Sequence, residues 1–336
     1  MTKENGRPRI LLVTTGGTIT MVKHGEEGLV PCSDANMLLD RVPEIRLIAD
    51  VDLLPLANID SSNVEPGLWV EIGRAIYERL GLYNGFVVTH GTDTLAYTAS
   101  GLSFVLQELN KPVVLTGSQV PLEEIGSDGR ANLINAFRVA CSDIAEVAVV
   151  FGSLIIRGCR AKKTSAFDLQ AFTSANAAPL GSIGLSIKFE GEVRRRAKRK
   201  PLLLPYLESS VGMITVYPGM KPEVLTWMAE HHAGVVIEGY GAGNLPTDGP
   251  MSLVPAIRAA VERGVSIVVC TQCLVGSTEM ELYKVGRSAL DAGAIPAMDM
   301  TPEATLVKLM WVLGQTRDPR TVDSLMQKSF AGELHA

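Results

Sequence analysis

Residues 85–95 read Gly-Phe-Val-Val-Thr-His-Gly-Thr-Asp-Thr-Leu, and their pattern is the most informative about the fold. Residues 86–89 form a short run without the alternation of apolar and polar positions that a half-exposed strand shows. Such a run is typical of a strand that is buried on both faces of a parallel sheet. The polar residues 90–94 follow, and a helical segment then extends to about Leu109. The stretch therefore predicts strand, loop and helix, with the loop at the carboxyl edge of a sheet.

The same alternation continues on both sides of this stretch. In the first half, the strand-like segments are 10–13, 45–56, 112–115 and 147–156, and the helical ones are 66–80 and 128–141. After a charged and proline-rich break, the strand-like segments are 213–217, 235–238 and 265–270, and the helical ones are 222–231, 253–263 and a region from Pro302. Strands that alternate with helices predict an α/β fold with a mostly parallel sheet flanked by helices.

The break between the two series predicts the domain organisation. We expect a larger N-terminal α/β domain over residues 1–191, a linker over 192–210 and a smaller C-terminal α/β domain over 211–336. The basic run 194–200 falls in this linker and is interpreted as solvated, because Gly191 precedes it and Pro201 follows it.

Composition excludes several classes of protein. The chain has 336 residues, of which 46% are hydrophobic and 20% charged, so a sizeable core can form. The net charge of -5 disfavours a nucleic-acid partner, which needs a basic surface. No apolar stretch is long enough for a membrane span, and no signal peptide is recognisable. With five cysteines and no disulfide framework, the sequence predicts a cytoplasmic protein without a membrane partner.

Three predicted strands end in small polar residues and glycine, at 14–18, 90–94 and 116–119. Because ligands bind beyond the carboxyl ends of parallel strands, we expect these loops to form a binding site. The phosphate-loop, dinucleotide and zinc-protease motifs are absent. The catalytic chemistry that remains is attack by a threonine hydroxyl, which needs a neighbouring base to take its proton. The candidate nucleophiles are Thr15 and Thr92.

The same loops carry a resemblance to a known family. Thr15-Gly16-Gly17-Thr18-Ile19 resembles the first active-site signature of bacterial L-asparaginases, and residues 85–95 match the second. Similarity extends over nearly the whole chain and is greatest to the cytoplasmic, type I branch. The resemblance implies a two-domain asparaginase-like fold, no metal or organic cofactor, and an amidohydrolase that converts L-asparagine to L-aspartate and ammonia.

The resemblance also implies a role for individual residues. The catalytic set is Thr15 as the nucleophile, Thr92 as a second threonine, Asp93 as the partner of the substrate's ammonium and Lys163 as the partner of Thr92. Substrate binding is expected from Asp60, Ser61, Ser62, Gly91, Ser118 and Leu29. Asn244 and Glu279 are expected to act across the interface of a homodimer or homotetramer. Lys163 could be a neutral base or a charged organiser, and both interpretations stay open.

The sequence departs from the family pattern beside the first signature. Leu29 stands where asparaginases carry a tyrosine that bonds to the nucleophile, and leucine cannot donate or accept a proton. Three alternatives follow. His24, Glu26 or Glu27 could replace the tyrosine in an ordinary asparaginase. The enzyme could act on a larger or cyclic amide, or the chain could be a non-catalytic amino-acid binder. A glutamyl-tRNA amidotransferase is disfavoured by the acidic charge.

Overall fold

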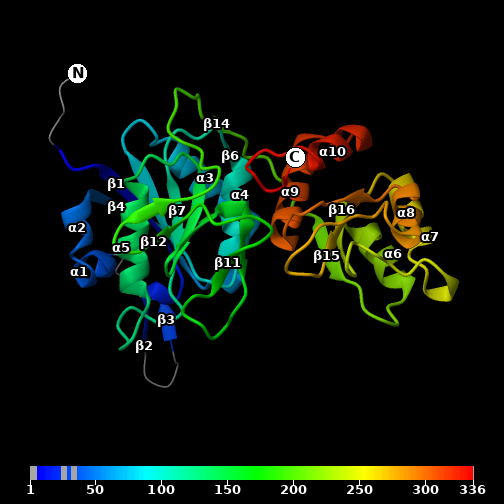
Figure 1. Cartoon of the computed structure of the whole chain (residues 1–336), viewed down its shortest axis with the longest axis horizontal. Coiled ribbons are helices and arrows are strands. Elements are labelled where there is room, and N and C mark those ends of the chain that lie inside the picture. Colours follow the sequence, from blue (N-terminus) through cyan, green and yellow to red (C-terminus); the bar gives the residue numbers. More distant parts are fainter. Residues whose placement is uncertain (1–5, 24–28, 32–35, 336) are drawn as a thin grey trace. The chain divides into compact units, whose positions relative to one another are not determined.

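The computed structural model describes residues 6–23, 29–31 and 36–335. Two compact units divide the chain, one up to Pro205 and one from Tyr206 (Figure 1). The division lies inside the segment predicted as a linker, but the first part of that segment packs on the first unit. Leu202–Leu203 (β14) pairs with Leu106–Gln107 (β6), and Arg195 forms an ion pair with Asp143.

A mixed sheet forms the centre of the first unit, with the strand order β13-β12-β9-β8-β7-β5-β1-β4. The five strands from β8 to β4 are parallel, and the remaining neighbours are antiparallel. Their bounds are β1 (Arg9–Gly16), β4 (Asp50–Ile59), β5 (Gly85–Thr89), β7 (Val113–Thr116), β8 (Val147–Phe151), β9 (Leu154–Arg157), β12 (Gly181–Ile183) and β13 (Ile187–Phe189). The predicted α/β class with a mostly parallel sheet is confirmed.

Helices cover both faces of this sheet (Figure 1). On one face lie α1 (Met37–Arg41), α2 (Ile45–Ile48) and α5 (Gly129–Ala140), and on the other lie α3 (Pro66–Tyr77) and α4 (Leu95–Val105). In β1, Ile10 and Leu12 pack in the cluster that contains α5, whereas Leu11 and Val13 pack in the cluster that contains α3 and α4. Both sides of the strand are therefore buried, which explains the continuous apolar runs.

Three predicted elements of the first unit differ from the structure. Residues 45–56 are not extended throughout, because Ile45–Ile48 forms α2 before β4 begins. The helix expected to reach Leu109 ends at Val105, where the chain turns into β6. Residues 147–156 form an antiparallel hairpin of β8 and β9, with Gly152 in the left-handed region at φ 57°.

The second unit is built on a parallel sheet in the order β15-β16-β17-β18. The strands are β15 (Val211–Thr215), β16 (Gly234–Gly239), β17 (Ser266–Thr271) and β18 (Ile295–Pro296), and the helices are α6 (Pro222–His231), α7 (Val254–Glu262), α8 (Lys284–Asp291), α9 (Pro302–Gln315) and α10 (Pro319–Met326). Residues of α6, α7 and α8 share one core with β16 and β17, while Leu309 and Leu313 of α9 lie against Gly234. The helix α8 is not among the elements expected from the sequence.

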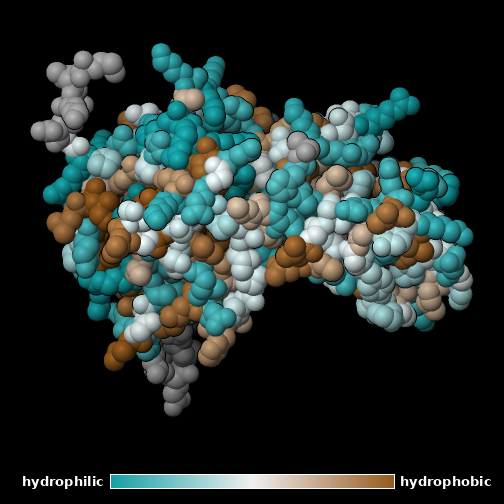
Figure 2. All heavy atoms as spheres, viewed as in Figure 1, coloured by the Kyte–Doolittle hydropathy of each residue, from teal (hydrophilic) through white to brown (hydrophobic). Residues whose placement is uncertain are grey.

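The surface seen in Figure 2 is largely hydrophilic, as expected when the apolar side chains of the sheets are covered by helices. Hydrophilic residues cover much of the face seen in Figure 2, and apolar residues form smaller groups between them. In the part of the chain that the structure describes, no helix has the length and apolar character needed to cross a membrane.

Strand order determines where a ligand can bind in the first unit. The chain passes from β1 to β4 on one side and then returns to β5 on the other side of β1. A crevice forms where the direction of winding reverses, at the carboxyl ends of β1 and β5. Both loops with active-site signatures leave the sheet at this place.

Candidate active site

A cavity of about 260 Å³ lies at the carboxyl ends of β1 and β5. Residues from separate loops line it: Gly17, Thr18, Asp60, Ser61, Gly91, Thr92, Asp93, Gln119, Lys163 and Ala166. The two signature loops and the 60–62 loop therefore meet in one polar site, as the sequence predicted.

Glycine allows these loops to approach so closely. A Cβ atom on Gly17 would collide with the backbone of Gly91, and one on Gly91 would lie 2.5 Å from Ser61 Oγ. Gly17 also adopts φ 82°, a conformation that other residues rarely adopt. Substitution of either glycine would push the loops apart.

Thr15 and Thr18 flank Gly16 and Gly17 in the first signature, and the structure places the two threonines differently. The Thr15 hydroxyl donates a hydrogen bond of 2.9 Å to the carbonyl of Thr89, and the residue is only 2% exposed. Thr15 is therefore adjacent to the cavity but is not one of the residues that line it. Thr18 does line the cavity. The turn through Gly16 and Gly17, both with positive φ, separates the two hydroxyls.

The 60–62 loop presents a carboxylate and a hydroxyl to the cavity. Asp60 Oδ1 accepts hydrogen bonds from the Ser62 hydroxyl at 2.6 Å and the Ser62 N–H at 2.8 Å. These two bonds lower the pKa of Asp60 below its ordinary value. Ser62 therefore positions Asp60 and does not line the cavity, in contrast to Ser61. The Thr94 hydroxyl donates to the Ser61 carbonyl at 2.7 Å and joins this loop to the second signature.

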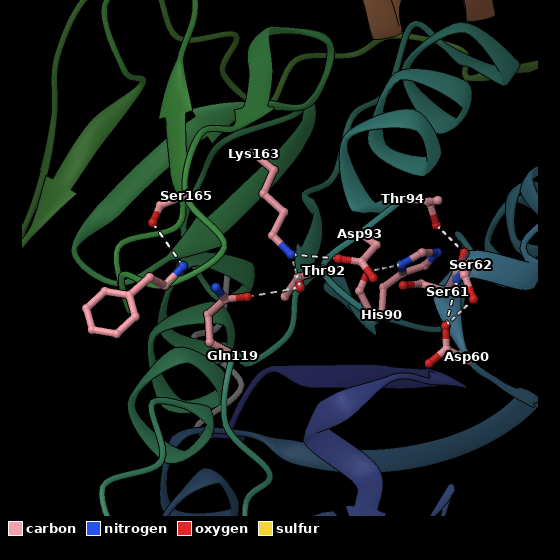
Figure 3. A network of polar contacts seen from close by, with 12 residues as sticks. Asp60, Ser61, Ser62, His90, Thr92, Asp93, Thr94, Gln119, Lys163 and Ser165 are labelled. Atoms are coloured by element: carbon pink, nitrogen blue, oxygen red, sulfur yellow. Dashed lines mark hydrogen bonds and ion pairs between the residues drawn. The ribbon is translucent and has the colours of Figure 1, made fainter. Parts of the chain in front are cut away.

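Lys163 connects two polar residues of the second signature, Thr92 and Asp93 (Figure 3). Its Nζ donates to Thr92 Oγ1 at 2.8 Å and forms an ion pair with Asp93 Oδ1 at 2.7 Å. The residue ends the short strand β10 (Ala161–Lys163), which pairs with β11 (Phe172–Ser174). The structure therefore brings Thr92, Asp93 and Lys163 together as the sequence predicted.

His90 lies beneath the site as a structural residue. It is fully buried, and burial lowers its pKa to about 4. Nδ1 lies 2.7 Å from the Gly91 carbonyl, which can only accept, so we assign the proton to Nδ1. Nε2 then accepts from the Thr98 hydroxyl at 2.8 Å. The neutral ring holds the Gly91 loop to α4.

Gln119 takes the place that was expected for Ser118. Ser118 is fully buried, and its hydroxyl has no hydrogen-bond partner among the described residues, so it does not line the cavity. Gln119 does, and Thr92 Oγ1 donates to its Oε1 at 3.0 Å. Thr18 and Gln119 both lie within stretches that carry the family resemblance, whereas nothing in the sequence points to Ala166.

The remaining expected residues are placed only in part. Leu29 belongs to the short strand β3 (Leu29–Pro31), which pairs with β2 (Met21–Lys23), and its side chain lies outside the described structure. His24, Glu26 and Glu27 lie outside the described residues. Asn244 and Glu279 belong to the second unit, and their action across a dimer interface stays a prediction.

Comparison with known proteins gives the family. The model described as "Asparaginase, N-terminal" matches residues 9–195, and "Glutaminase/Asparaginase C-terminal domain" matches 210–326. The chain belongs to the asparaginase family. It is an amidohydrolase of the asparaginase type.

Relatives within the asparaginase family carry two kinds of name. An L-asparaginase of Thermococcus kodakarensis is 40% identical over 97% of this chain and 99% of its own length. A component of the glutamyl-tRNA(Gln) amidotransferase of Pyrococcus furiosus is also 40% identical, over 97% of this chain and 77% of its own length. The solved structure of the thermostable L-asparaginase from T. kodakarensis superposes with a TM-score of 0.92 at 39% identity and covers 98% of this chain and 99% of that one. The two-domain asparaginase fold is confirmed.

Proposed function

We propose that this asparaginase-family enzyme hydrolyses L-asparagine to L-aspartate and ammonia through a threonine nucleophile. The observation that carries the proposal is the meeting of both signature loops with Ser61 and Asp93 around one cavity. A free amino acid has an ammonium and a carboxylate, so its site needs an anionic group and hydroxyl or N–H donors. Asp93 supplies the first, and the Ser61 loop supplies the second.

Thr15 is the residue to which we assign the nucleophile. It lies near the carboxyl end of β1, beside β5, and holds the position that its resemblance to the first signature implies. Its O–H donates to the Thr89 carbonyl, so neither lone pair of Oγ1 is used by that bond and both stay free for attack. Reaction requires the hydroxyl to face the ligand, and Gly16 and Gly17 place no side chain in its way. Thr18 is the competing candidate, because it lines the cavity.

The chemistry follows from a hydroxyl placed next to a bound carboxamide. Thr15 Oγ1 attacks the carboxamide carbon, its proton passes to the leaving nitrogen, and ammonia departs from an acyl-threonine ester. Water then hydrolyses the ester and restores the hydroxyl. The backbone of the Gly91 and Thr92 loop is the candidate donor to the oxyanion, and one such donor is worth roughly 10²–10³ in rate.

Variants of the two threonines test the assignment. With purified protein and asparagine, ammonia release should be abolished in Thr15→Ala and partly kept in Thr15→Ser, which retains a hydroxyl. Thr18→Ala should lower turnover but leave it measurable, because it removes only a group that lines the cavity. Full activity in Thr15→Ala together with loss of activity in Thr18→Ala would move the nucleophile to Thr18.

A different amide substrate is the second candidate, favoured by Leu29 in place of a tyrosine. Glutamine, larger amides and cyclic imides should therefore be assayed beside asparagine, with ammonia and product mass as readouts. If Leu29 adapts the enzyme to such a substrate, Leu29→Tyr should improve poor asparagine hydrolysis. Specific binding of asparagine without turnover of any amide would favour the non-catalytic binder.

The names of the relatives leave amidotransferase function as a competing proposal. The net charge of -5 favours an independent hydrolase, because a tRNA partner would need a distributed basic surface. Ammonia release from asparagine by the purified chain alone, without tRNA, is the expected result. We further propose that the protein is cytoplasmic and forms a homodimer or homotetramer. Light scattering of the purified protein would test the oligomeric state.

A further inference from the structure

Gln119 has a second interaction that fixes the orientation of its side-chain amide. Its Nε2 donates to the backbone carbonyl of Asp168 at 3.4 Å, and a carbonyl can only accept. The other end of the amide, Oε1, is therefore the end that faces Thr92 (Figure 3). An oxygen at this position can accept the Thr92 proton but cannot donate one.

The backbone around Gln119 is held just as firmly. The carboxylate of Asp128 accepts hydrogen bonds from the N–H groups of Gln119 and Val120 at 3.0 and 3.1 Å. Asn132 Nδ2 in turn donates to Asp128 Oδ2 at 2.9 Å, and Asn132 is almost fully buried. The backbone of Gln119 is thus held by Asp128, the residue directly before α5.

These contacts determine which way the Thr92 hydroxyl points. A threonine hydroxyl has one proton and two lone pairs. Lys163 forms an ion pair with Asp93, and as an ammonium it can only donate, so it occupies one lone pair and the single proton goes to Gln119 Oε1. Thr92 lines the cavity, so the second lone pair of its hydroxyl is the one left for a ligand. Thr92 can therefore accept a hydrogen bond from a ligand but has no proton to donate to it.

We propose that Gln119 is a positioning residue that makes Thr92 an acceptor and thereby selects carboxamide over carboxylate in the cavity. The NH₂ of a carboxamide can donate to Thr92, whereas an ionised carboxylate presents only acceptors to it. The inference rests on the proposed function, and it predicts that the enzyme discriminates L-asparagine from its product L-aspartate. Without Gln119 the hydroxyl can rotate and donate to the product carboxylate.

The test measures binding without turnover at pH 7.5, in a Thr15→Ala/Thr18→Ala background that lacks both candidate nucleophiles. Calorimetry gives the Kd of L-asparagine and of L-aspartate for the background protein and for the same protein with Gln119→Met, which keeps the length of the side chain and removes the acceptor. We expect the background protein to prefer asparagine, and Gln119→Met to reduce this preference about tenfold, the effect of one hydrogen bond. Gln327→Met, an exposed glutamine far along the chain, is the matched control and should leave the preference unchanged.

Gln119→Glu separates positioning from a merely structural role. Glutamate keeps an oxygen that accepts the Thr92 proton, although it loses the donor to the Asp168 carbonyl, and its negative charge also disfavours aspartate, so the preference for asparagine should be retained or increased. An unchanged preference in Gln119→Met, or an equal loss in the Met and Glu variants, would overturn the inference. Binding of asparagine without hydrolysis by the wild-type protein would contradict only the proposed hydrolysis. If neither ligand binds, the inference falls together with the proposed function.

Discussion

Lys163 is the side chain that contacts two neighbouring residues of the second signature. Its ammonium contacts both Thr92 and Asp93, so Lys163→Met should lower kcat for asparagine by ~10²-fold or more, the usual contribution of a positioned proton-transfer group. Lys163→Arg keeps a charged donor, so partial rescue would favour the organiser over the neutral base. Lys162→Met is the matched control, since neighbouring residues of a strand point to opposite faces. Equal losses in Lys162→Met and Lys163→Met would contradict this role.

His90 makes stability depend on pH. Its pKa is about 4 in the folded protein and 6.5 ordinarily, so between these values the unfolded chain binds more protons. The free energy of unfolding should therefore fall as the pH drops from 6.5 to 4, and about 3 kcal/mol of that fall should come from His90. His90→Asn should show a correspondingly smaller fall in urea unfolding over this window. The same pH dependence in both proteins would contradict this effect of burial.

Helix α9 is anchored to the C-terminal segment by a buried ion pair. Lys308 Nζ lies 2.7 Å from Glu333 Oε1 and donates to the carbonyls of Met326 and Lys328, and both charged side chains are fully buried. Lys308→Met leaves a buried carboxylate without its counter-charge and should cost about 3–5 kcal/mol in urea unfolding. The double variant Lys308→Met/Glu333→Leu should recover much of this loss. A double variant less stable than the single one would contradict the assignment of the loss to the unpaired carboxylate.

Local sequence predicts those elements that are long and uniformly buried. The runs in β1, β5, β7 and β17 are apolar because their side chains pack into enclosed cores. The hairpin at Gly152 escapes prediction because its two strands are as apolar as one long strand. The helix α2 escapes it because a single turn is too short to show a helical period. Such features depend on tertiary packing rather than on local pattern.

The sequence predicts the loops of the candidate site but not the placement of every side chain. Thr15 and Thr18 flank the same glycine pair, and only the backbone turn through Gly16 and Gly17 determines which hydroxyl lines the cavity. Ser118 and Gln119 are neighbours in the loop after β7, yet Ser118 is buried and Gln119 lines the cavity. Which member of each pair lines the cavity depends on the backbone conformation of its loop, which local sequence does not determine.

At the scale of the whole molecule, the second unit is expected to contribute to the hydrolysis of asparagine through Glu279. Among the described residues, all those that line the cavity belong to the first unit, whereas Glu279 is an exposed residue of the second. If Glu279 completes the site of another chain, Glu279→Gln should lower kcat/KM for asparagine about tenfold, the value of one charged hydrogen bond. Glu281→Gln, two residues away and also exposed, should not. Equal activity of both variants, with the oligomer intact by light scattering, would exclude this role.

The proposed mechanism requires the Thr15 hydroxyl to become acylated, which peptide mass spectrometry after acid quenching detects. The enzyme would be mixed with a slowly hydrolysed amide or a reactive analogue, quenched and digested, and the peptide over the first signature fragmented to separate Thr15 from Thr18. We predict an acyl group on Thr15 that is absent in Thr15→Ala. An adduct on Thr18, Thr92 or any other side chain would contradict the account.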